Sequence, residues 1–465
     1  PYFLDIEALV DKGLLKEKEC EAALPEGEKT RVDYAAMYER RLPLLRRAYA
    51  RASRERGFNK KLREYASEHP HIRNYALFMA IKQYEGGSPW YEWPSELRDR
   101  DMAAIRRLMP KLRREYMANL FIQRELFSQW SLLRRHAAEA GVKLMGDMPI
   151  YCAYDSADCW AAPWAFLFDE SKRPISVAGV PPDYFSSTGQ LWGNPLYDWA
   201  AIRRRGYRFW LERLTAAARL YDVLRIDHFR GFEAYYAIPA GAPDATQGEW
   251  QKGCGYELFK RFSAMQTTGA APSCEIVAED LGVITPLVKR LLTRTGFAGM
   301  QVMQFAFDGS RKNPHIIKKW DGDLRHIINK AAYTGTHDNP PLAAWWRDIS
   351  LEERRRALRC AGVTEKGIAD FLIGEDVCRD CLTGNCEFRG AEEKRRCELA
   401  AFYMARALAH CRARYCIIPM QDVLGLGAES RMNTPATAQD NWRWRMTNEQ
   451  LASCTARLQR IFGLR

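Results

Sequence analysis

Ionisable side chains gather at the end of an apolar run, Val223–Phe232, which reads VLRIDHFRGF. Its first residues suit a buried strand, and Asp227 and His228 follow directly. In α/β folds, and in barrels above all, the residues that carry out chemistry lie at the C-terminal ends of the strands. Arg225 precedes Asp227 by two residues and therefore lies on the same strand face. A neighbouring cation keeps an aspartate ionised, so Asp227 is a candidate nucleophile.

Carboxylates also end two other apolar runs. Glu275–Gly282 (EIVAEDLG) carries Glu279 and Asp280, and Ala331–Asn339 (AAYTGTHDN) carries Asp338. Because each acid follows an apolar run, all of them are expected at one rim of the same barrel. A single acid would be explained better as a capping or supporting residue. Acids at three strand ends, two of them with His or Arg beside them, favour a catalytic site.

Three carboxylates suit chemistry at a glycosidic bond. Such chemistry needs one carboxylate as nucleophile or base and a second one as acid. An oxocarbenium-like transition state also gains from a further negative charge nearby. Asp227, Glu279 and Asp338 could fill these three roles. His228 and His337 could donate hydrogen bonds to sugar hydroxyls.

Other chemistries lack their motifs. The sequence has no P-loop, no GxGxxG after a strand, no HExxH and no GxSxG elbow. Its eight histidines are dispersed, which disfavours a His-rich metal site. We therefore expect the acid, base and nucleophile to be side chains, with no organic cofactor and no metal.

Strands and helices alternate along the part of the chain that carries these acids. The alternation predicts an α/β fold, specifically a (β/α)8 TIM-type barrel with inserted, mostly helical subdomains. Residues 1–141 are expected to form a mostly helical insertion subdomain, because apolar positions recur there at three and four. Residues 142–465 are expected to form the catalytic barrel, with a long loop subdomain at 151–199. Six apolar runs predict its strands. Three of them are the runs described above, which begin at Val223, Glu275 and Ala331, and the other three are Val142–Tyr151, Met300–Phe307 and Tyr415–Gly425.

Composition is that of an ordinary globular enzyme, with 465 residues, 47% apolar and 28% charged. Aromatic residues reach 12%, with 14 Trp, which fits core packing and also sugar stacking. The net charge of +12 raises the question of a nucleic-acid partner. The basic residues are spread along the chain, however, and the densest runs, Arg203–Arg205 and Arg354–Arg356, are expected on solvated helix faces. We therefore expect no nucleic-acid partner.

The sequence shows no secretory signal peptide and no apolar run long enough to span a membrane. A cytoplasmic protein with no membrane partner and reduced thiols is therefore expected, despite 13 cysteines. One cysteine cluster begins with CxxC and could hold a structural zinc ion. Ten residues separate its last two members, which disfavours zinc, and Asp376–Gly390 is interpreted as a surface loop with incidental thiols. The cluster consists of Cys378, Cys381, Cys386 and Cys397.

Seven segments follow the pattern of one known family. They read GDMPIYCAYDSADCWA, VAGVPPDYFSSTGQLWGNPLYDW, RIDHFRGFEAYYAIP, IVAEDLGVITPLV, GFAGMQVMQFAF, YTGTHDN and ESRMNTPATAQDNWRWRM. At these segments the sequence resembles the α-amylase clan, and more closely its 4-α-glucanotransferases, which are called amylomaltases or disproportionating enzymes. The resemblance extends from Pro1 to about Met446.

The resemblance implies a role for each of the three acids. Asp227 matches the family's nucleophile, Glu279 its general acid/base and Asp338 its transition-state stabiliser. The implied reaction is a retaining double displacement on α-1,4-glucan, with a malto-oligosaccharide or glucose as acceptor. The resemblance also implies residues for substrate binding: Arg225 and His337 around the donor sugar, Asp147 after an earlier strand, and Asp183, Gln190, Trp192 and Asn194 in a loop that covers the cleft. His228 remains a binding candidate on its own chemistry.

The resemblance also bears on the fold. The six predicted strands correspond to barrel strands 3–8, so barrel strands 1 and 2 are expected to be absent from this sequence. Two departures from the family pattern occur: Cys254 stands where relatives commonly have proline, and Asn339 is followed by two prolines. Neither departure replaces one of the three acids.

Three alternative functions remain open at this point. An α-glucan hydrolase of the amylase type would use the same acids but would release glucose and maltose from maltotriose rather than longer chains. A glucan-binding relative with impaired catalysis would show affinity without turnover. A basic nucleic-acid binder would show salt-sensitive retention on DNA, which the dispersed charge disfavours.

Overall fold

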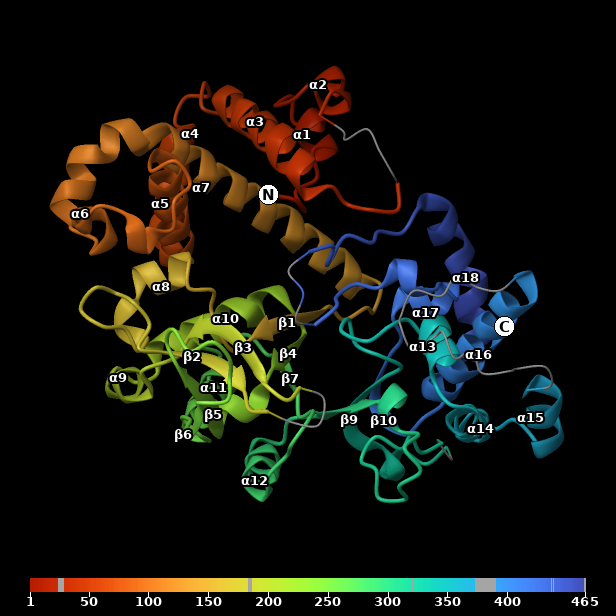
Figure 1. The fold of residues 1–465 in the computed structure, drawn as a ribbon. Coiled ribbons are helices and arrows are strands. Elements are labelled where there is room, and N and C mark those ends of the chain that lie inside the picture. The colour runs from red at the N-terminus through yellow and green to blue at the C-terminus, as the bar shows by residue number, and fades with distance from the viewer. Residues whose placement is uncertain are drawn as a thin grey trace. The chain divides into compact units, whose positions relative to one another are not determined.

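The computed structural model describes residues 1–23, 29–182, 186–319, 322–372, 390–435, 437 and 439–463. It is a mixed α/β structure of helices and strands (Figure 1). The chain divides into two compact units. Unit 1 comprises Pro1–Glu26, Asp33–Glu279 and Ile284–Gly296. Unit 2 comprises Gly27–Val32, Asp280–Val283 and Phe297–Arg465. Each unit contains a three-stranded parallel sheet with helices around it.

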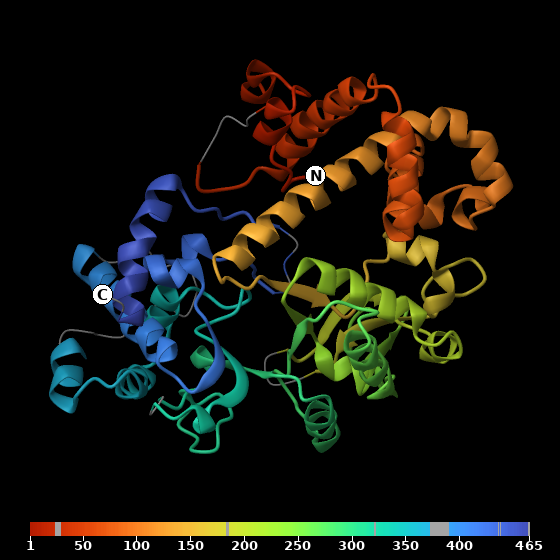
Figure 2. The ribbon, with the colours of Figure 1, turned by 180° about the vertical axis from the view of Figure 1, so that it is seen from behind.

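The first part of unit 1 is helical, as its apolar spacing predicts. Buried side chains of the helices between residues 4 and 122 pack into one apolar cluster, which includes Leu45, Leu62 and Phe121. The longest helix is α7, which Figure 2 shows along its length as the long orange helix. The helices of this part are α1 Glu7–Asp11, α2 Glu17–Glu21, α3 Tyr34–Ala52, α4 Phe58–Glu68, α5 Pro70–Tyr84, α6 Ser95–Arg98 and α7 Met102–Glu139, with the 3₁₀ turn η1 Trp90–Glu92.

The parallel sheet of unit 1 carries two of the three candidate acids. Its strands are β1 Met145–Pro149, β4 Val223–Asp227 and β7 Glu275–Ala278, in the order β1-β4-β7. The register pairs Asp147 with Arg225 across β1 and β4, so their side chains leave the sheet side by side. The remaining helices of unit 1 are α8 Ala157–Ala161, α9 Trp199–Arg204, α10 Arg208–Leu220, α11 Glu257–Thr267 and α12 Pro286–Thr295, with the 3₁₀ turns η2 Pro163–Ala165 and η3 Phe229–Phe232.

Unit 1 also contains an antiparallel sheet that the sequence pattern did not predict. Its order is β3-β2-β5-β6, and two of its strands lie in the segment 151–199, which was expected to be a loop. These strands are short, and a register shift between Val177 and Gly179 interrupts the pairing of β2 with β3, so no regular alternation marks them in the sequence. The strands are β2 Ser176–Val180, β3 Gln190–Pro195, β5 Ala234–Pro239 and β6 Glu249–Lys252.

Local sequence sets several helix boundaries, and α12 is the clearest case. Thr285 accepts a hydrogen bond from the backbone N–H of Val288, and Pro286 occupies the first turn, where a missing N–H costs nothing. Gly296 ends the helix at φ 69°, in the left-handed region. These local signals account for both ends of the helix Pro286–Thr295.

Unit 2 is built on a second parallel sheet, in the order β10-β9-β8. Its strands are β8 Gly299–Val302, β9 Ile328–Tyr333 and β10 Ala413–Ile417. A core that includes Trp346, Leu358 and Met404 packs its helices together. These helices are α13 Leu342–Asp348, α14 Leu351–Cys360, α15 Glu365–Leu372, α16 Ala391–Ala409, α17 Met420–Leu424 and α18 Asn448–Phe462, with the 3₁₀ turns η4 Met303–Phe305, η5 Leu324–His326 and η7 Ala428–Ser430.

Two predicted strands of unit 2 are shorter than expected. The run 300–307 leaves the strand at Val302 and continues as η4. The run 415–425 is divided by Pro419, which ends β10 and precedes α17. Proline cannot donate to a strand ladder but suits the start of a helix, so an apolar run can change its secondary structure at this residue.

All six predicted strands are present, and each sheet keeps them in sequence order. The pairing within the described residues forms two separate three-stranded parallel sheets, and no closed barrel is detected. The coarser prediction of an α/β fold with parallel strands is therefore confirmed. The (β/α)8 barrel and the division into 1–141 and 142–465 stay predictions.

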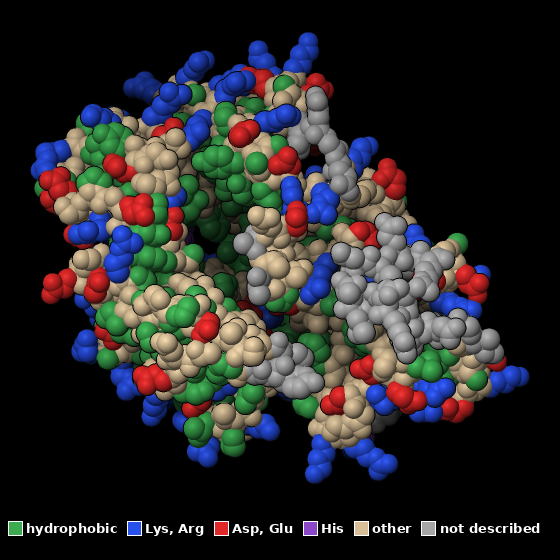
Figure 3. Space-filling model, viewed as in Figure 1, with side chains coloured by type: hydrophobic (Ala, Val, Ile, Leu, Met, Phe, Trp, Pro, Cys, Tyr) green, Lys and Arg blue, Asp and Glu red, His purple; other side chains and the backbone are tan. Residues whose placement is uncertain are grey.

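Charge and cysteine predictions have mixed outcomes. Lys and Arg side chains are scattered among acidic and apolar ones on the face shown in Figure 3. Arg354 is an exception to the predicted solvated faces, because it is buried and donates to the backbone carbonyls of Trp346 and Arg347. Three members of the cysteine cluster lie outside the described residues, and Cys397 is buried in α16.

Two features are absent from the part of the chain that the structure describes. Within it, no group of three or more His, Cys, Asp or Glu side chains is placed to hold a metal ion. No helix within those ranges is both long and apolar enough to cross a membrane.

Candidate active site

Arg225 holds two carboxylates at the C-terminal edge of the sheet in unit 1. Its Nη1 donates to Asp147 Oδ2 at 2.5 Å, and its Nη2 donates to Asp227 Oδ1 at 2.7 Å. The side chain of Arg225 is only 9% exposed, whereas that of Asp227 is 42% exposed. A buried guanidinium therefore fixes a carboxylate that stays open to a ligand. This geometry confirms the predicted pairing of Arg225 with Asp227.

Glu279 directly follows β7 and is tied to the residues that follow Asp227. Its Oε2 accepts a hydrogen bond from the backbone N–H of His228 at 2.8 Å. Its backbone carbonyl accepts the N–H of Phe229, and its own N–H donates to the carbonyl of Ile226. These three bonds place Glu279 beside the end of β4, so the structure brings together two acids that lie about 50 residues apart in the sequence.

His228 is held in an unusual backbone conformation beside these acids. Its φ is 50°, in the left-handed region that residues other than glycine adopt uncommonly. Its ring lies 4.9 Å from the ring of Trp192 and 6.3 Å from that of Tyr151. Burial lowers the pKa of His228 to about 4, so the ring is neutral at pH 7.

Two buried polar atoms of this aromatic group have no hydrogen-bond partner among the described residues. They are Nε2 of His228 and the hydroxyl of Tyr151. Buried polar groups in native proteins are normally bonded, so an unpaired pair beside exposed carboxylates is suited to sugar hydroxyls. Tyr151 was not among the predicted site residues, although its position at the end of the run 142–151 was a usable signal.

The loop residues that the resemblance implies have different surroundings. Trp192 is partly exposed, and its Nε1 donates to Gln190 Oε1 at 3.1 Å. Asn194 donates to the backbone carbonyl of Cys152 at 3.0 Å, which makes it a link between two segments. Asp183 lies outside the described residues. The structure therefore places Trp192 beside His228 and leaves the prediction for Asp183 untested.

Asp338 and His337 belong to unit 2, in the loop after β9. Asn433 Nδ2 donates to Asp338 Oδ1 at 2.5 Å, and Arg431 Nη2 donates to the backbone carbonyl of Asp338 at 2.6 Å. His337 Nε2 lies 3.5 Å from Asp338 Oδ2. The side chain of Asp338 therefore has a fixed orientation. Arg431 and Asn433 were not among the predicted site residues.

Asp422 closes this loop at both of its ends. Thr334 Oγ1, just before the loop, donates to Asp422 Oδ2 at 2.5 Å, and the backbone N–H of Leu342, just after it, donates to Oδ1 at 2.6 Å. All three residues are buried. Burial raises the pKa of Asp422 to about 6, against the effect of the two bonds. One buried carboxylate thus clamps the loop 335–341, which carries Asp338.

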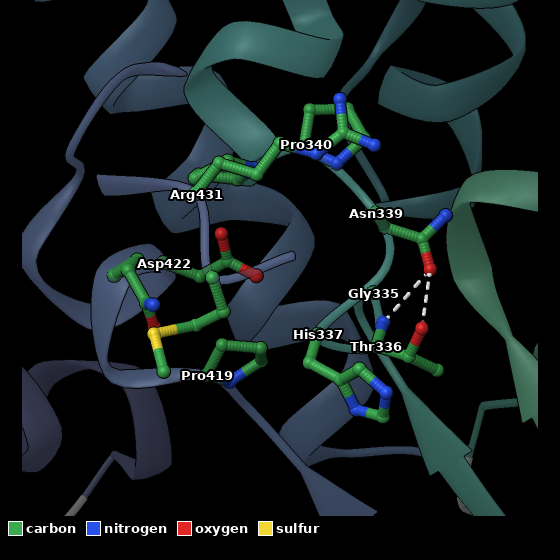
Figure 4. A pocket seen from close by; sticks show the side chains of 11 residues that line it. Gly335, Thr336, His337, Asn339, Pro340, Pro419, Asp422 and Arg431 are labelled. Carbon is green, nitrogen blue, oxygen red and sulfur yellow. Dashed lines mark hydrogen bonds between the residues drawn. The ribbon is translucent and has the colours of Figure 1, made fainter. Parts of the chain in front are cut away.

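A pocket of about 120 Å³ lies beside the clamped loop. Figure 4 shows Thr336 and Asn339 on one side of it, joined by hydrogen bonds, and Asp422 and Pro419 on the other. Asp422 was not among the predicted site residues, because it lies inside the predicted run 415–425 and apolar residues follow it. The pocket is lined by Gly335, Thr336, His337, Asn339, Pro340, Pro341, Pro419, Gln421, Asp422, Arg431 and Met432.

Comparison with known proteins identifies the family. A family model described as 4-alpha-glucanotransferase matches residues 1–451. The 4-alpha-glucanotransferase of Thermus thermophilus is 39% identical over 460 residues, which is 97% of this chain and 83% of that protein. The chain belongs to the 4-alpha-glucanotransferase family.

Other members of the 4-alpha-glucanotransferase family show the same relation. The chloroplastic/amyloplastic enzyme of Solanum tuberosum is 38% identical over 448 residues, covering 95% of this chain and 70% of that protein. The solved structure of amylomaltase from Streptococcus agalactiae in complex with acarbose superposes with a TM-score of 0.84 at 31% identity. That match covers 99% of this chain and 85% of the other. The resemblance stated from the motifs is confirmed.

His228 is expected to make this glucanotransferase-family protein sensitive to acid. The pKa of His228 is about 4 when folded and near 6.5 when unfolded, so the unfolded state binds the extra proton first as the pH falls. The contribution of the neutral His228 ring to the free energy of unfolding is fully present above pH 6.5. It is lost as the pH falls toward 4, by up to about 3 kcal/mol. We expect His228→Asn, which keeps a residue tolerant of positive φ, to flatten this dependence.

Urea unfolding of both proteins at several pH values between 7.5 and 4.5 measures the effect. The wild type should lose more stability than His228→Asn as the pH is lowered, so the difference in their free energies of unfolding should shrink. A loss of packing in the variant affects this difference equally at every pH. A difference that is constant with pH would contradict a neutral buried imidazole. His326→Asn is a matched control, because His326 is an exposed histidine of unit 2.

Proposed function

We propose that this protein is a 4-α-glucanotransferase that moves segments of α-1,4-glucan from a donor to the 4-hydroxyl of glucose or a malto-oligosaccharide. The observation that carries the proposal is the arrangement around Asp227. Its carboxylate is held by buried Arg225, remains exposed, and lies on the strand next to the one that Glu279 follows. Family membership supports the same activity.

Asp227 is proposed as the nucleophile of a retaining double displacement. Its ion pair with Arg225 engages Oδ1, which leaves Oδ2 as the attacking oxygen. Attack of that oxygen on the anomeric carbon breaks the glycosidic bond, and Glu279 protonates the leaving oxygen. In the second half, Glu279 removes a proton from the acceptor hydroxyl, which displaces Asp227 with net retention.

Asp338 is proposed as the stabiliser of the oxocarbenium-like transition state, with His337 beside the donor sugar. The hydrogen bond from Asn433 supports this role, because it orients the Asp338 carboxylate. Asp147 and His228 are proposed to contact the same donor sugar. Gln190, Trp192, Asn194 and Asp183 are proposed to belong to the loop that covers the bound glucan.

Transfer to sugar rather than to water requires an acceptor site from which water is excluded. Trp192 and the neutral ring of His228 supply apolar surface that suits the faces of sugar rings.

We propose malto-oligosaccharides and α-glucans as the substrates, with the chemistry supplied by side chains. The proposed fold is a (β/α)8 barrel to which the six parallel strands contribute strands 3–8, with 1–141 as an inserted helical subdomain. We also propose a cytoplasmic location, in which the cysteines stay reduced.

Incubation with maltotriose tests the proposed activity. A transferase should produce glucose together with a ladder of oligosaccharides longer than maltotriose, detectable by chromatography within the first turnovers. Release of glucose and maltose alone would instead identify a hydrolase. Binding of maltotriose without any product would identify a glucan-binding protein.

Asp422→Ala is expected to reduce transfer although Asp422 is not proposed to touch the glucan. The variant removes the acceptor for Thr334 and Leu342, so the loop that carries Asp338 loses both of its anchors. Small displacements of a catalytic group cost much activity, so we expect kcat to fall by roughly tenfold to a hundredfold with little change in KM.

Asp422→Asn is the matched variant for this test. Its amide keeps the shape, can accept from Leu342 and can donate to Thr334 Oγ1, so it should recover most of the lost activity. Steady-state kinetics on maltotriose with both variants, together with their melting temperatures, measures the effect. Equal activity of a folded Asp422→Ala variant and wild type would show that the clamp does not position the loop.

A further inference from the structure

Two thiols of unit 2 lie in contact with each other. Cys411 is two residues beyond the end of α16, and Cys416 lies within β10. Their Sγ atoms are 3.5 Å apart. The sulfur atoms of a disulfide are separated by about 2.05 Å, so they would have to approach by only about 1.5 Å. Rotation of the side chains together with a small shift of the backbone covers a displacement of this size.

The surroundings of Cys411 favour its thiolate. The backbone N–H of Ala413 donates to Cys411 Sγ at 3.4 Å, and the same sulfur shares a hydrogen bond with Cys416 Sγ, in which either sulfur can be the donor. These donors lower the pKa of Cys411 to about 7, with the bond from Cys416 as the largest cause. By contrast, burial raises the pKa of Cys360 to about 11. The thiolate is the form that reacts with oxidants.

Access to the pair is limited to small molecules. Cys411 is 8% exposed, whereas Cys416 is half-buried. A peroxide is small enough to reach such a position, while a bulky disulfide reagent is not. Cys416 lies in β10, which is paired with β9 in the sheet of unit 2.

We propose that Cys411 and Cys416 form an oxidisable thiol pair that a small peroxide converts reversibly into a disulfide. The Cys411 thiolate attacks one peroxide oxygen, the O–O bond breaks, and the released oxygen leaves as water after taking a proton. The product is a sulfenic acid on Cys411. The sulfur of Cys416 then attacks Cys411 Sγ, the S–O bond breaks, and the proton of Cys416 leaves with hydroxide as a second water. Two thiols and one peroxide thus give one disulfide and two waters.

The disulfide would change the structure at the base of the Asp338 loop. Cys416 pairs with Ala332 of β9, and the carbonyl of the next residue, Ile417, accepts the N–H of Thr334 at 3.3 Å. Thr334 is also the residue that Asp422 clamps. Pulling Cys416 toward Cys411 therefore moves the strand that anchors this loop. The expected loss of transfer, about twofold to thirtyfold, rests on the proposed function.

Peptide mapping of the full chain tests the pair directly. Protein treated with hydrogen peroxide is alkylated with iodoacetamide and digested with trypsin, which cuts at Arg412 and Arg414 and so separates the two cysteines. We expect a linked pair of peptides, two hydrogens lighter than the sum of the reduced ones, that disappears on treatment with dithiothreitol. Cys411→Ser and Cys416→Ser should abolish it, and Cys360→Ser should not. Separate alkylated or over-oxidised peptides in the wild type would overturn the proposal.

Transfer measured on the same samples tests the effect on the loop. Oxidised wild type should lose transfer and recover it with dithiothreitol, while Cys416→Ser should be insensitive to the same treatment. A disulfide that forms without any change in transfer would overturn the coupling to the loop. Absence of transfer in the untreated wild type would instead refute the proposed function. In that case the peptide map alone would decide whether Cys411 and Cys416 form the disulfide.

Discussion

Asp227→Asn is expected to abolish glucan transfer while leaving the protein folded. The amide has nearly the shape of the carboxylate and can still accept from Arg225, which keeps its second partner, Asp147. It is a very poor nucleophile, however, so the first displacement loses its attacking group. We expect kcat to fall by at least about 10⁴-fold, which corresponds to about 5 kcal/mol of barrier.

Initial rates on maltotriose, with a melting curve for each protein, measure this effect. Asp244→Asn is a matched control in the same unit, because Asp244 is a carboxylate whose hydrogen bonds come from its own turn residue Thr246. The control should keep wild-type transfer. A folded Asp227→Asn protein that retains even a few per cent of the wild-type rate would refute the assignment of Asp227 as nucleophile.

Glu279→Gln is expected to lose transfer in a way that depends on the donor. The amide oxygen can still accept from the N–H of His228, so the local backbone should be kept. Because the amide cannot protonate a leaving oxygen, kcat on maltotriose should fall by about 10²- to 10⁴-fold. A donor such as α-maltosyl fluoride needs no protonation of its leaving group, so its first displacement should be close to the wild-type rate.

The comparison of these two donors distinguishes an acid from a merely structural residue. Glu275→Gln is the matched control, since Glu275 begins the same strand and pairs with Lys143. It should affect neither donor. Equal losses on maltotriose and on maltosyl fluoride would show that Glu279 supports the fold of the site rather than acting as the acid.

The sequence by itself determined the elements and the acids. Apolar runs predicted all six parallel strands, because buried parallel strands are continuous in sequence and end abruptly where they meet solvent. The change from apolar to charged residues at 227 and 279 marked the edge where the structure places both carboxylates. The family motifs determined the proposed roles of the residues. Such signals are local, which is why they can be read without a structure.

The tertiary structure alone decided how the side chains meet. Arg225 pairs with Asp147 across 78 residues, and Asp422 pairs with Thr334 and Leu342 across 88 and 80 residues. No periodicity encodes such pairs, because they depend on which strands are neighbours and on their register. The neutral state of His228 likewise follows from burial against Trp192 and Tyr151, which only packing creates. The sequence therefore indicated which acids could react, and the fold decided which of them are held, buried or left open.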